Sequence, residues 1–139
     1  FEFDIVVWRD CTVPFIRNKD IKNSIKLLKE KRANLVIGVY HQHLNPYYNI
    51  VEKTKNGFLQ LVKKTYSRPK SRQLSPKVYQ MNGLHIYDVN KFLKTKKIVT
   101  NFSECIPYII PPQTGLMIDT EFEFEIAKLL IEQKKIKLD

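Results

Sequence analysis

Two short apolar runs separated by a helical pattern constrain the fold of this chain more than any other feature. Phe3 to Trp8 and Asn34 to Tyr40 are rich in β-branched and aromatic residues, which is typical of buried strands in a parallel sheet. Between them, from about Asp20 to Arg32, apolar residues recur at helical spacing while lysines fill the opposite face. We expect Asn18 or Asp20 to cap this helix. The β-α-β order predicts an α/β protein with a mostly parallel sheet and flanking helices.

The middle of the chain departs from this pattern. Strand-like pieces at Tyr48 to Val51 and Phe58 to Val62 lie on either side of Asn56-Gly57, a pair that favours a tight hairpin turn because both residues tolerate positive φ. We therefore predict a single domain over residues 1–139 with an inserted β-hairpin excursion at about residues 41–77.

Strands and helices resume after the insertion. The pattern predicts a strand from Val78 to Tyr87, a short helix from Val89 to Leu93 and a strand from Ile106 to Ile110. The last segment begins with strand-like alternation, but we predict a helix. Its acidic residues lie in the first turns and its lysines near the end, which is the polarity that the helix dipole favours. Asp119 or Thr120 would supply the N-cap.

Composition points to a globular protein inside the cell. The 139 residues are 43% hydrophobic with only four glycines, which suits one domain with a real core. No apolar run approaches the roughly 18 residues that a membrane span needs, and the first residues carry no secretory pattern. We expect a cytoplasmic protein that does not bind membranes.

The positive charge indicates an anionic ligand. Its formal value is +10, which attracts phosphate, carboxylate or nucleic acid alike. We see no nucleic-acid recognition motif and no Arg-Gly repeats, so we expect no nucleic-acid partner. Basic residues also gather in one stretch without any acidic residue, formed by Lys53, Lys55, Lys63, Lys64, Arg68, Lys70, Arg72 and Lys77.

Asp119 is the first candidate site residue. It closes an apolar run and precedes a helix, so we expect it at the carboxyl end of a strand, where open α/β sheets bind their ligands. A carboxylate at that place can hold Mg²⁺ against phosphate oxygens. The alternative is that Asp119 only caps the final helix.

Two further segments carry candidate binding residues. Arg68 and Arg72 lie in a loop that contains proline, where their guanidinium groups can clamp a carboxylate or phosphate; the alternative is a solvated basic loop. Asn82-Gly83 lies inside a predicted strand, where glycine often marks close approach by a ligand or another backbone. Asn82 can then donate and accept hydrogen bonds toward a polyol, and a simple bulge is the equal alternative.

Four short motifs follow one another along the chain: Asp10-Cys11-Thr12-Val13-Pro14, Asn45-Pro46-Tyr47-Tyr48, Arg72-Gln73 through Tyr79 to Asn82-Gly83, and Ile118-Asp119-Thr120-Glu121. In this order and near this spacing they resemble the acylneuraminate cytidylyltransferase family, which contains the CMP-sialic acid synthetases. The motifs cover nearly the whole chain, and their order is more specific than any one of them.

The resemblance implies a nucleotide-diphospho-sugar transferase-like fold and an enzyme that uses Mg²⁺. Such an enzyme joins CMP from CTP to a 2-keto-3-deoxy sugar acid of the nonulosonic, sialic-like class and releases pyrophosphate. The resemblance also implies a homodimer formed through the excursion. Asp119 matches a metal-binding, catalytic carboxylate, and Arg72 and Gln73 match the basic substrate-loop pair, with Arg72 also catalytic. Asn82 matches the sugar-contacting Asn-Gly, and on the same resemblance we expect substrate-binding roles for Asp10, in the first motif, and for Tyr87.

Two positions depart from the family pattern. Met117 stands where the first metal carboxylate is usual, and a thioether is a poor ligand for a hard cation. Metal binding is then lost or rests on Asp119 with substrate phosphates and water. The usual Thr-Ser-Pro is Thr12-Val13-Pro14 here, so we expect altered contacts from that loop.

The family's first strand and its Gly-Ser-Lys loop, which cradles CTP, have no counterpart in this sequence. We therefore expect a partial domain in which Phe3 to Trp8 exposes an edge, and little turnover from this chain alone. The alternative reading is a degenerate, non-catalytic module that binds a sugar acid or a partner.

Overall fold

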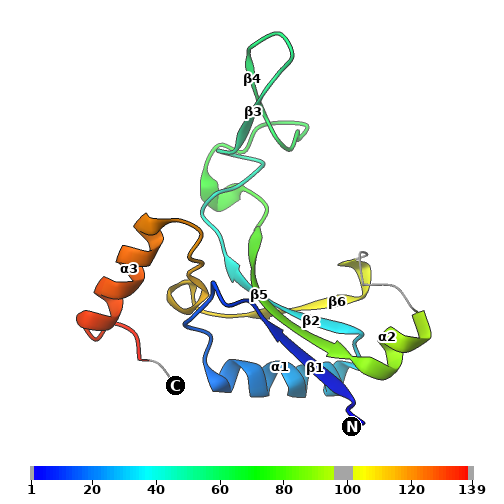
Figure 1. The fold of residues 1–139 in the computed structure, drawn as a ribbon. Coiled ribbons are helices and arrows are strands. Elements are labelled where there is room, and N and C mark those ends of the chain that lie inside the picture. Colours follow the sequence, from blue (N-terminus) through cyan, green and yellow to red (C-terminus); the bar gives the residue numbers. More distant parts are fainter. Residues whose placement is uncertain (1, 96–101, 138–139) are drawn as a thin grey trace. The chain divides into compact units, whose positions relative to one another are not determined.

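The computed structural model describes residues 2–95 and 102–137, and its contacts divide the chain into two compact units (Figure 1). The first, which we call the sheet unit, comprises Phe1–Tyr40 and Met81–Asp139. The second, which we call the hairpin unit, comprises His41–Gln80. No helix among the described residues is long and apolar enough to cross a membrane.

A four-stranded mixed sheet forms the centre of the sheet unit. Its strands, in spatial order, are β1 (Ile5–Arg9), β5 (Tyr79–Asp88), β2 (Leu35–His41) and β6 (Cys105–Ile109). β5 runs antiparallel to β1, and β2 runs parallel to β6. The N–H of Asp88 donates to the carbonyl of Asn34 at 3.1 Å, so the end of β5 lies at the start of β2 and these two strands are also antiparallel. The α/β fold class is confirmed, with β5 as the one reversed strand of this sheet.

β1 is an exposed edge strand, as the missing counterpart of the family's first strand predicted, whereas its apolar run alone predicted a buried strand. It is not a buried strand between parallel neighbours; it ends the strand order and pairs only with β5 among the described strands. Trp8 is 59% exposed and Val7 39%. An apolar run predicts a strand but does not reveal how many neighbours the strand has, so the exposure of this edge follows from topology rather than from local pattern.

Helix α1 (Asn18–Lys31) covers one face of the sheet. Leu28 from the helix and Val36, Leu84 and Ile86 from the strands form the main buried cluster. α1 is amphipathic, as the sequence predicted, because its apolar residues face this cluster while its lysines face solvent. Burial of these side chains holds β1, β5 and β2 in register beneath the helix.

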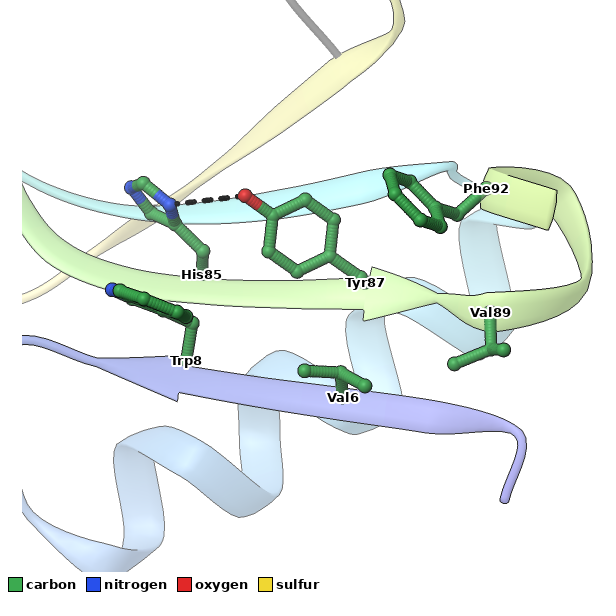
Figure 2. A pocket seen from close by; sticks show the side chains of 6 residues that line it. All are labelled: Val6, Trp8, His85, Tyr87, Val89 and Phe92. Atoms are coloured by element: carbon green, nitrogen blue, oxygen red, sulfur yellow. Dashed lines mark hydrogen bonds between the residues drawn. The ribbon is translucent and has the colours of Figure 1, made fainter. Parts of the chain in front are cut away.

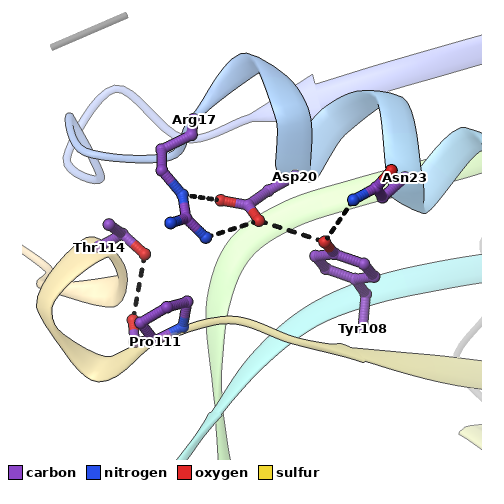
Figure 3. Close-up of polar contacts among 6 residues, drawn as sticks. All are labelled: Arg17, Asp20, Asn23, Tyr108, Pro111 and Thr114. Carbon is purple, nitrogen blue, oxygen red and sulfur yellow. Dashed lines mark hydrogen bonds and ion pairs between the residues drawn. The ribbon is translucent and has the colours of Figure 1, made fainter.

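The first turn of α1 is not capped by Asn18 or Asp20. Arg17 is the N-cap residue and makes no side-chain cap bond. Asp20 is instead 2% exposed, and its carboxylate accepts from Arg17 at 2.7 and 2.9 Å and from the Tyr108 hydroxyl at 3.2 Å (Figure 3). The capping prediction is wrong because the Asp20 carboxylate binds Arg17 and Tyr108 instead, and Tyr108 lies on β6, far away in the sequence.

Helix α3 (Glu121–Glu132) begins with a complete capping box, which confirms the predicted helix. The Thr120 hydroxyl accepts from the Glu123 backbone N–H, and the Glu123 carboxylate accepts in return from the N–H of Thr120. Ala127 and Leu130 pack with Phe15 and Ile136 in a second core cluster. Thr120 is therefore the N-cap, and Asp119 lies one residue before it.

The capping box makes the stability of α3 depend on pH. Hydrogen bonds from the Asp119 N–H and then from the Thr120 hydroxyl and N–H lower the pKa of Glu123. A carboxylate with a lowered folded-state pKa contributes stability that is complete above its unfolded pKa and is lost as the pH falls through the folded pKa. We expect Glu123→Gln to lower Tm most near neutral pH, and this difference to shrink in acid.

Far-UV circular dichroism during thermal unfolding measures this effect. Glu132→Gln is the matched control, because it changes the net charge equally at the other end of α3 without touching the cap. A Tm difference for Glu123→Gln that stays constant from neutral to acid pH would contradict the prediction.

The remaining elements complete the two units. They are α2 (Val89–Thr95), the 3₁₀ helices η1 (Arg72–Leu74), η2 (Phe102–Glu104) and η3 (Pro112–Gly115), and the antiparallel hairpin of β3 (Val51–Lys53) and β4 (Leu59–Leu61). In the predicted turn between β3 and β4 only Gly57 has positive φ, at 86°. Thr54 closes the turn by accepting from the Phe58 N–H at 3.1 Å through its hydroxyl. The predicted hairpin is confirmed, but its first strand begins at Val51 and not at Tyr48, because Tyr48 and Asn49 lie in a turn.

Candidate functional site

Asp10 packs directly against Gly83 at the end of β1. The Asp10 N–H donates to the Gly83 carbonyl at 3.0 Å, and the Trp8 indole N–H donates to Asp10 Oδ1 at 2.7 Å. Gly83 has a φ of 73°, and a Cβ on it would lie 2.7 Å from the Asp10 Cβ. A neighbour does approach Gly83 closely, but it is the side chain of Asp10 and not the ligand or backbone that was expected.

Asn82 is fully buried with half of its amide unsatisfied. Its Oδ1 accepts from the Leu84 N–H at 3.4 Å, and its side chain fills the space that a side chain at Gly38 would need. Its Nδ2 has no hydrogen-bond partner among the described residues. A buried donor without an acceptor costs about 1–3 kcal/mol, so this amide is suited to an acceptor oxygen from outside the described chain.

Tyr87 faces away from Asn82. Side chains five positions apart on a strand point to opposite faces, and Leu84 and Ile86 share the α1 face with Asn82. The Tyr87 hydroxyl instead lies 3.4 Å from His85 Nδ1 on the other face (Figure 2). The structure therefore separates two residues to which the resemblance assigns the same substrate.

Burial is the largest cause of the pKa shifts of His85 and Tyr87. It lowers the pKa of His85, and the nearby Asp10 carboxylate opposes that shift in part. Burial also raises the pKa of Tyr87, with a smaller contribution from Cys105. Near neutral pH the His85 ring and the Tyr87 phenol are both uncharged, so these two side chains offer an anion only neutral donors.

Asp119 lies next to the loop that follows Asp10, but not at the end of a strand. The Ile118 N–H donates to the Thr12 carbonyl at 2.9 Å, and the residues between η3 and α3 are irregular. Asp119 itself is exposed. The predicted strand end is wrong because the apolar residues before Asp119 are partly buried by packing outside any strand: Met117 packs against the main cluster and Ile118 against the second.

The residues present do not form a Mg²⁺ site by themselves. No group of three or more His, Cys, Asp or Glu side chains is placed to hold a metal ion in residues 2–95 and 102–137. Met117 packs into the core, so Asp119 is left without the carboxylate partner that the motif pattern usually supplies. Magnesium binding at Asp119 stays a prediction.

The hairpin unit contains a separate basic cavity of about 320 Å³. Arg72 and Gln73, from η1, are among its lining residues, and no carboxylate is. The full lining is His41, Gln42, Asn45, Arg72, Gln73, Ser75, Pro76 and Lys77. The cavity thus combines two side chains that are cationic at neutral pH with several neutral hydrogen-bonding groups.

Asn45 fixes one wall of this cavity, a role that sequence reasoning missed. It is 4% exposed; its Nδ2 donates to the Pro76 carbonyl at 2.9 Å, and its Oδ1 accepts from the Tyr47 N–H at 2.9 Å. These bonds tie the loop before β3 to the loop after η1. In the sequence, Asn45 stood out only as part of the Asn45-Pro46-Tyr47-Tyr48 motif, which could not reveal its contact with Pro76.

Arg68, the other candidate clamp, is already engaged. Its Nη2 donates to the Tyr48 carbonyl at 3.3 Å, and its guanidinium lies 5.6 Å from the centre of the Tyr48 ring. It does not line the cavity. Of the two arginines in the basic loop, Arg72 is therefore the better placed to meet a ligand.

Comparisons with known proteins agree with the four motifs. The chain is 24% identical over 137 residues to "Post-translational flagellin modification protein B" of Campylobacter coli, covering 98% of this chain and 56% of that protein. It is 29% identical over 93 residues to a CMP-N,N'-diacetyllegionaminic acid synthase of Campylobacter jejuni subsp. jejuni serotype O:2, covering 66% of this chain and 37% of the synthase. No protein-family model matches.

The fold is similar to that of a solved CMP:2-keto-3-deoxy-manno-octonic acid synthetase, whose structure is a complex with CTP. The TM-score is 0.61 at 12% identity, over 96% of this chain and 64% of that one. The predicted resemblance to the CMP-sugar-acid cytidylyltransferases and the nucleotidyltransferase-like fold are confirmed. The chain spans about half the length of the first of these relatives and less of the second.

Proposed function

We propose that this chain is the sugar-acid-binding part of a CMP-nonulosonate synthetase, which transfers CMP from CTP to a 2-keto-3-deoxy sugar acid and releases pyrophosphate. The observation that carries the proposal is the basic cavity of the hairpin unit, because Arg72 and Gln73, which the resemblance assigns to substrate, both line it. A volume of about 320 Å³ lies at the lower end of the range for small-molecule sites.

The lining suits a carboxylate that carries hydroxyl groups. A guanidinium can hold a carboxylate through two parallel hydrogen bonds, and Lys77 adds a second positive charge. Gln73 and Ser75 supply donors and acceptors for hydroxyls. The absence of a carboxylate from the lining avoids repulsion of an acid. Within the sheet unit, the unsatisfied Nδ2 of Asn82 supports a role in binding a ligand oxygen.

The proposed reaction needs no covalent bond between the protein and its substrates. The anomeric hydroxyl of the sugar acid is the nucleophile and the α-phosphorus of CTP is attacked, so catalysis consists mainly of positioning and neutralising charge. In the hairpin unit, Arg72 would hold and orient the acid. In the sheet unit, Asp10 would support the loop beside which Asp119 lies. Magnesium, which would neutralise phosphate charge, would need ligands beyond those that residues 2–95 and 102–137 provide.

We also propose that two copies associate through the β3–β4 hairpin. Large apolar side chains stand exposed on it: Val51 at 47%, Phe58 at 75% and Leu59 at 70%. Contiguous exposed apolar residues on a two-stranded hairpin favour a protein contact. Light scattering after gel filtration should give a dimer mass that Phe58→Ser with Leu59→Ser reduces to that of a monomer.

Isothermal titration with a nonulosonic acid tests the cavity directly. Arg72→Ala is expected to weaken binding about 10–100-fold, since charge-assisted hydrogen bonds contribute about 1.5–3 kcal/mol. Arg68→Ala is the matched control: it removes the same charge from the same loop, but its guanidinium lies on Tyr48 and should leave affinity within about twofold. Equal losses in the two variants would show that net charge, not this cavity, binds the acid.

A pyrophosphate-release assay with CTP, Mg²⁺ and several nonulosonic acids separates enzyme from binding module. The second candidate function, a non-catalytic module that holds a sugar acid or a partner, is favoured by the packing of Met117 into the core. Sugar-acid binding that ignores CTP and Mg²⁺, without pyrophosphate release even when the part of the relatives beyond the match is supplied, would establish the module.

A further inference from the structure

Three neutral side chains that line the basic cavity already bind groups within the hairpin unit. Gln42 Nε2 donates to Gln80 Oε1 at 2.5 Å, and the Ser75 hydroxyl donates to the Ser71 carbonyl at 3.2 Å. The amide nitrogen and the amide oxygen of Asn45 are both engaged, each at 2.9 Å. These side chains therefore form fixed walls, and a ligand must be held mainly by the other members of the lining.

The other polar side chains of the lining have no hydrogen bond or ion pair within residues 2–95 and 102–137. They are His41, Arg72, Gln73 and Lys77. His41 only meets the ring of Tyr79 edge-on, with 6.0 Å between the ring centres. Arg72 and Lys77 can donate hydrogen bonds but cannot accept them, and no carboxylate in the lining balances their two positive charges. The lining thus favours a ligand that is rich in acceptor oxygens and carries two negative charges.

Backbone contacts hold the chain on both sides of Lys77. The Pro76 carbonyl accepts from Asn45 Nδ2 at 2.9 Å, and the Val78 carbonyl accepts from the Gln42 N–H at 3.2 Å. The guanidinium of the cavity comes from η1, whose 3₁₀ turn fixes the backbone there. Because both cations project from backbone that is already ordered, a ligand that bridges them has to order little of the chain on binding.

The charge of the whole hairpin unit adds to that of the lining. Residues 41–80 contain eight basic residues and one acidic residue, Glu52, so this unit carries +7 of the +10 net charge of the chain. Glu52 lies on β3, where it accepts from Gln60 Nε2 at 2.8 Å, and it is not part of the lining. Attraction by this field grows with the charge of the ligand. A dianion is therefore drawn to the cavity more strongly than a monocarboxylate.

We propose that this cavity also binds a compact oxyanion with at least two negative charges, and that pyrophosphate, the product of the proposed reaction, is its ligand. Arg72 would hold one phosphoryl group through two parallel hydrogen bonds, and Lys77 would neutralise the other. Because the sugar acid needs the same guanidinium, pyrophosphate would compete with it, and accumulated product would slow the reaction. The need for two charges follows from the lining, whereas the choice of pyrophosphate rests on the proposed function.

Isothermal titration of the chain with pyrophosphate and with a nonulosonic acid, both without Mg²⁺, compares the two ligands. Lys77→Gln should weaken pyrophosphate binding about tenfold, because it removes one of two cations, and sugar-acid binding by less than about threefold, because Arg72 keeps the single carboxylate. Lys70→Gln is the matched control: it removes the same charge from the hairpin unit outside the lining, and should change either affinity by less than about twofold.

The outcomes separate this inference from the proposed function. Equal weakening of pyrophosphate binding by Lys77→Gln and Lys70→Gln would overturn the inference, since the field of the unit and not the cavity would then bind the ligand. Sugar-acid binding without any pyrophosphate binding would overturn it as well, and would leave the proposed function intact. Pyrophosphate binding without sugar-acid binding would support the inference and contradict the sugar-acid site. Mutual displacement of the two ligands, with both lost in Arg72→Ala, would support both.

Discussion

Replacing Arg17 by alanine is expected to lower the free energy of unfolding by about 3 kcal/mol. Asp20 is 2% exposed, and Arg17 donates to both of its carboxylate oxygens (Figure 3). Removal of the guanidinium leaves a buried charge whose remaining side-chain donor is the Tyr108 hydroxyl. The estimate lies at the lower end of the range for a broken buried pair, because the Arg17 side chain is itself 24% exposed and water can partly replace it.

Urea denaturation of three variants isolates the cause. Arg17→Ala with Asp20→Asn should be less destabilised than Arg17→Ala alone, because a neutral amide leaves no buried charge behind. Lys26→Ala is the matched control on the same helix; it breaks an exposed pair with Glu30 at 3.6 Å and should change stability by no more than about 0.5 kcal/mol. Equal losses for Arg17→Ala and Lys26→Ala would refute the argument.

The sequence predicted the elements of this fold well, because local periodicity controls them. The helical spacing of apolar residues in α1 predicted a helix with one buried face, and the apolar run of β2 predicted a buried strand; both predictions agree with the structure. The order and direction of the strands could not be predicted from local pattern. The residues of β5 do not show that it is the reversed strand, and those of β1 do not show that it lies at the edge. Such properties depend on residues far apart in the chain, and a single sequence shows no direct sign of them.

In the candidate site, too, local pattern predicted some features and could not predict others. A glycine inside a strand predicted close approach at Gly83, since that rule is local, but the identity of Asp10 as the neighbour needed the β1–β5 register. The apolar residues before Asp119 predicted that it would end a strand. Two of them, Met117 and Ile118, are instead partly buried by contacts with the two core clusters, outside any strand. Apolar character predicts burial, and burial does not require a strand.

The contact between Gly83 and Asp10 predicts a second large loss of stability. Gly83→Ala is expected to cost about 2–4 kcal/mol, combining about 1–2 for a side chain at positive φ with a similar amount for overpacking. A Cβ there would lie 2.7 Å from the Cβ and from the Cγ of Asp10, atoms that are fixed close to the backbone and cannot swing away as a long side chain can. Gly57→Ala isolates the first contribution, because Gly57 has a φ of 86° with nothing within 4 Å of its Cβ position.

A double-mutant cycle in urea separates strain from collision. In an Asp10→Gly background the obstructing side chain is gone, so Gly83→Ala should then cost only about as much as Gly57→Ala, roughly 1 kcal/mol. An undiminished cost in that background would mean that backbone strain alone explains the glycine and that Asp10 is free to move. A reduced cost would instead show that the side chain of Asp10 requires a glycine at position 83.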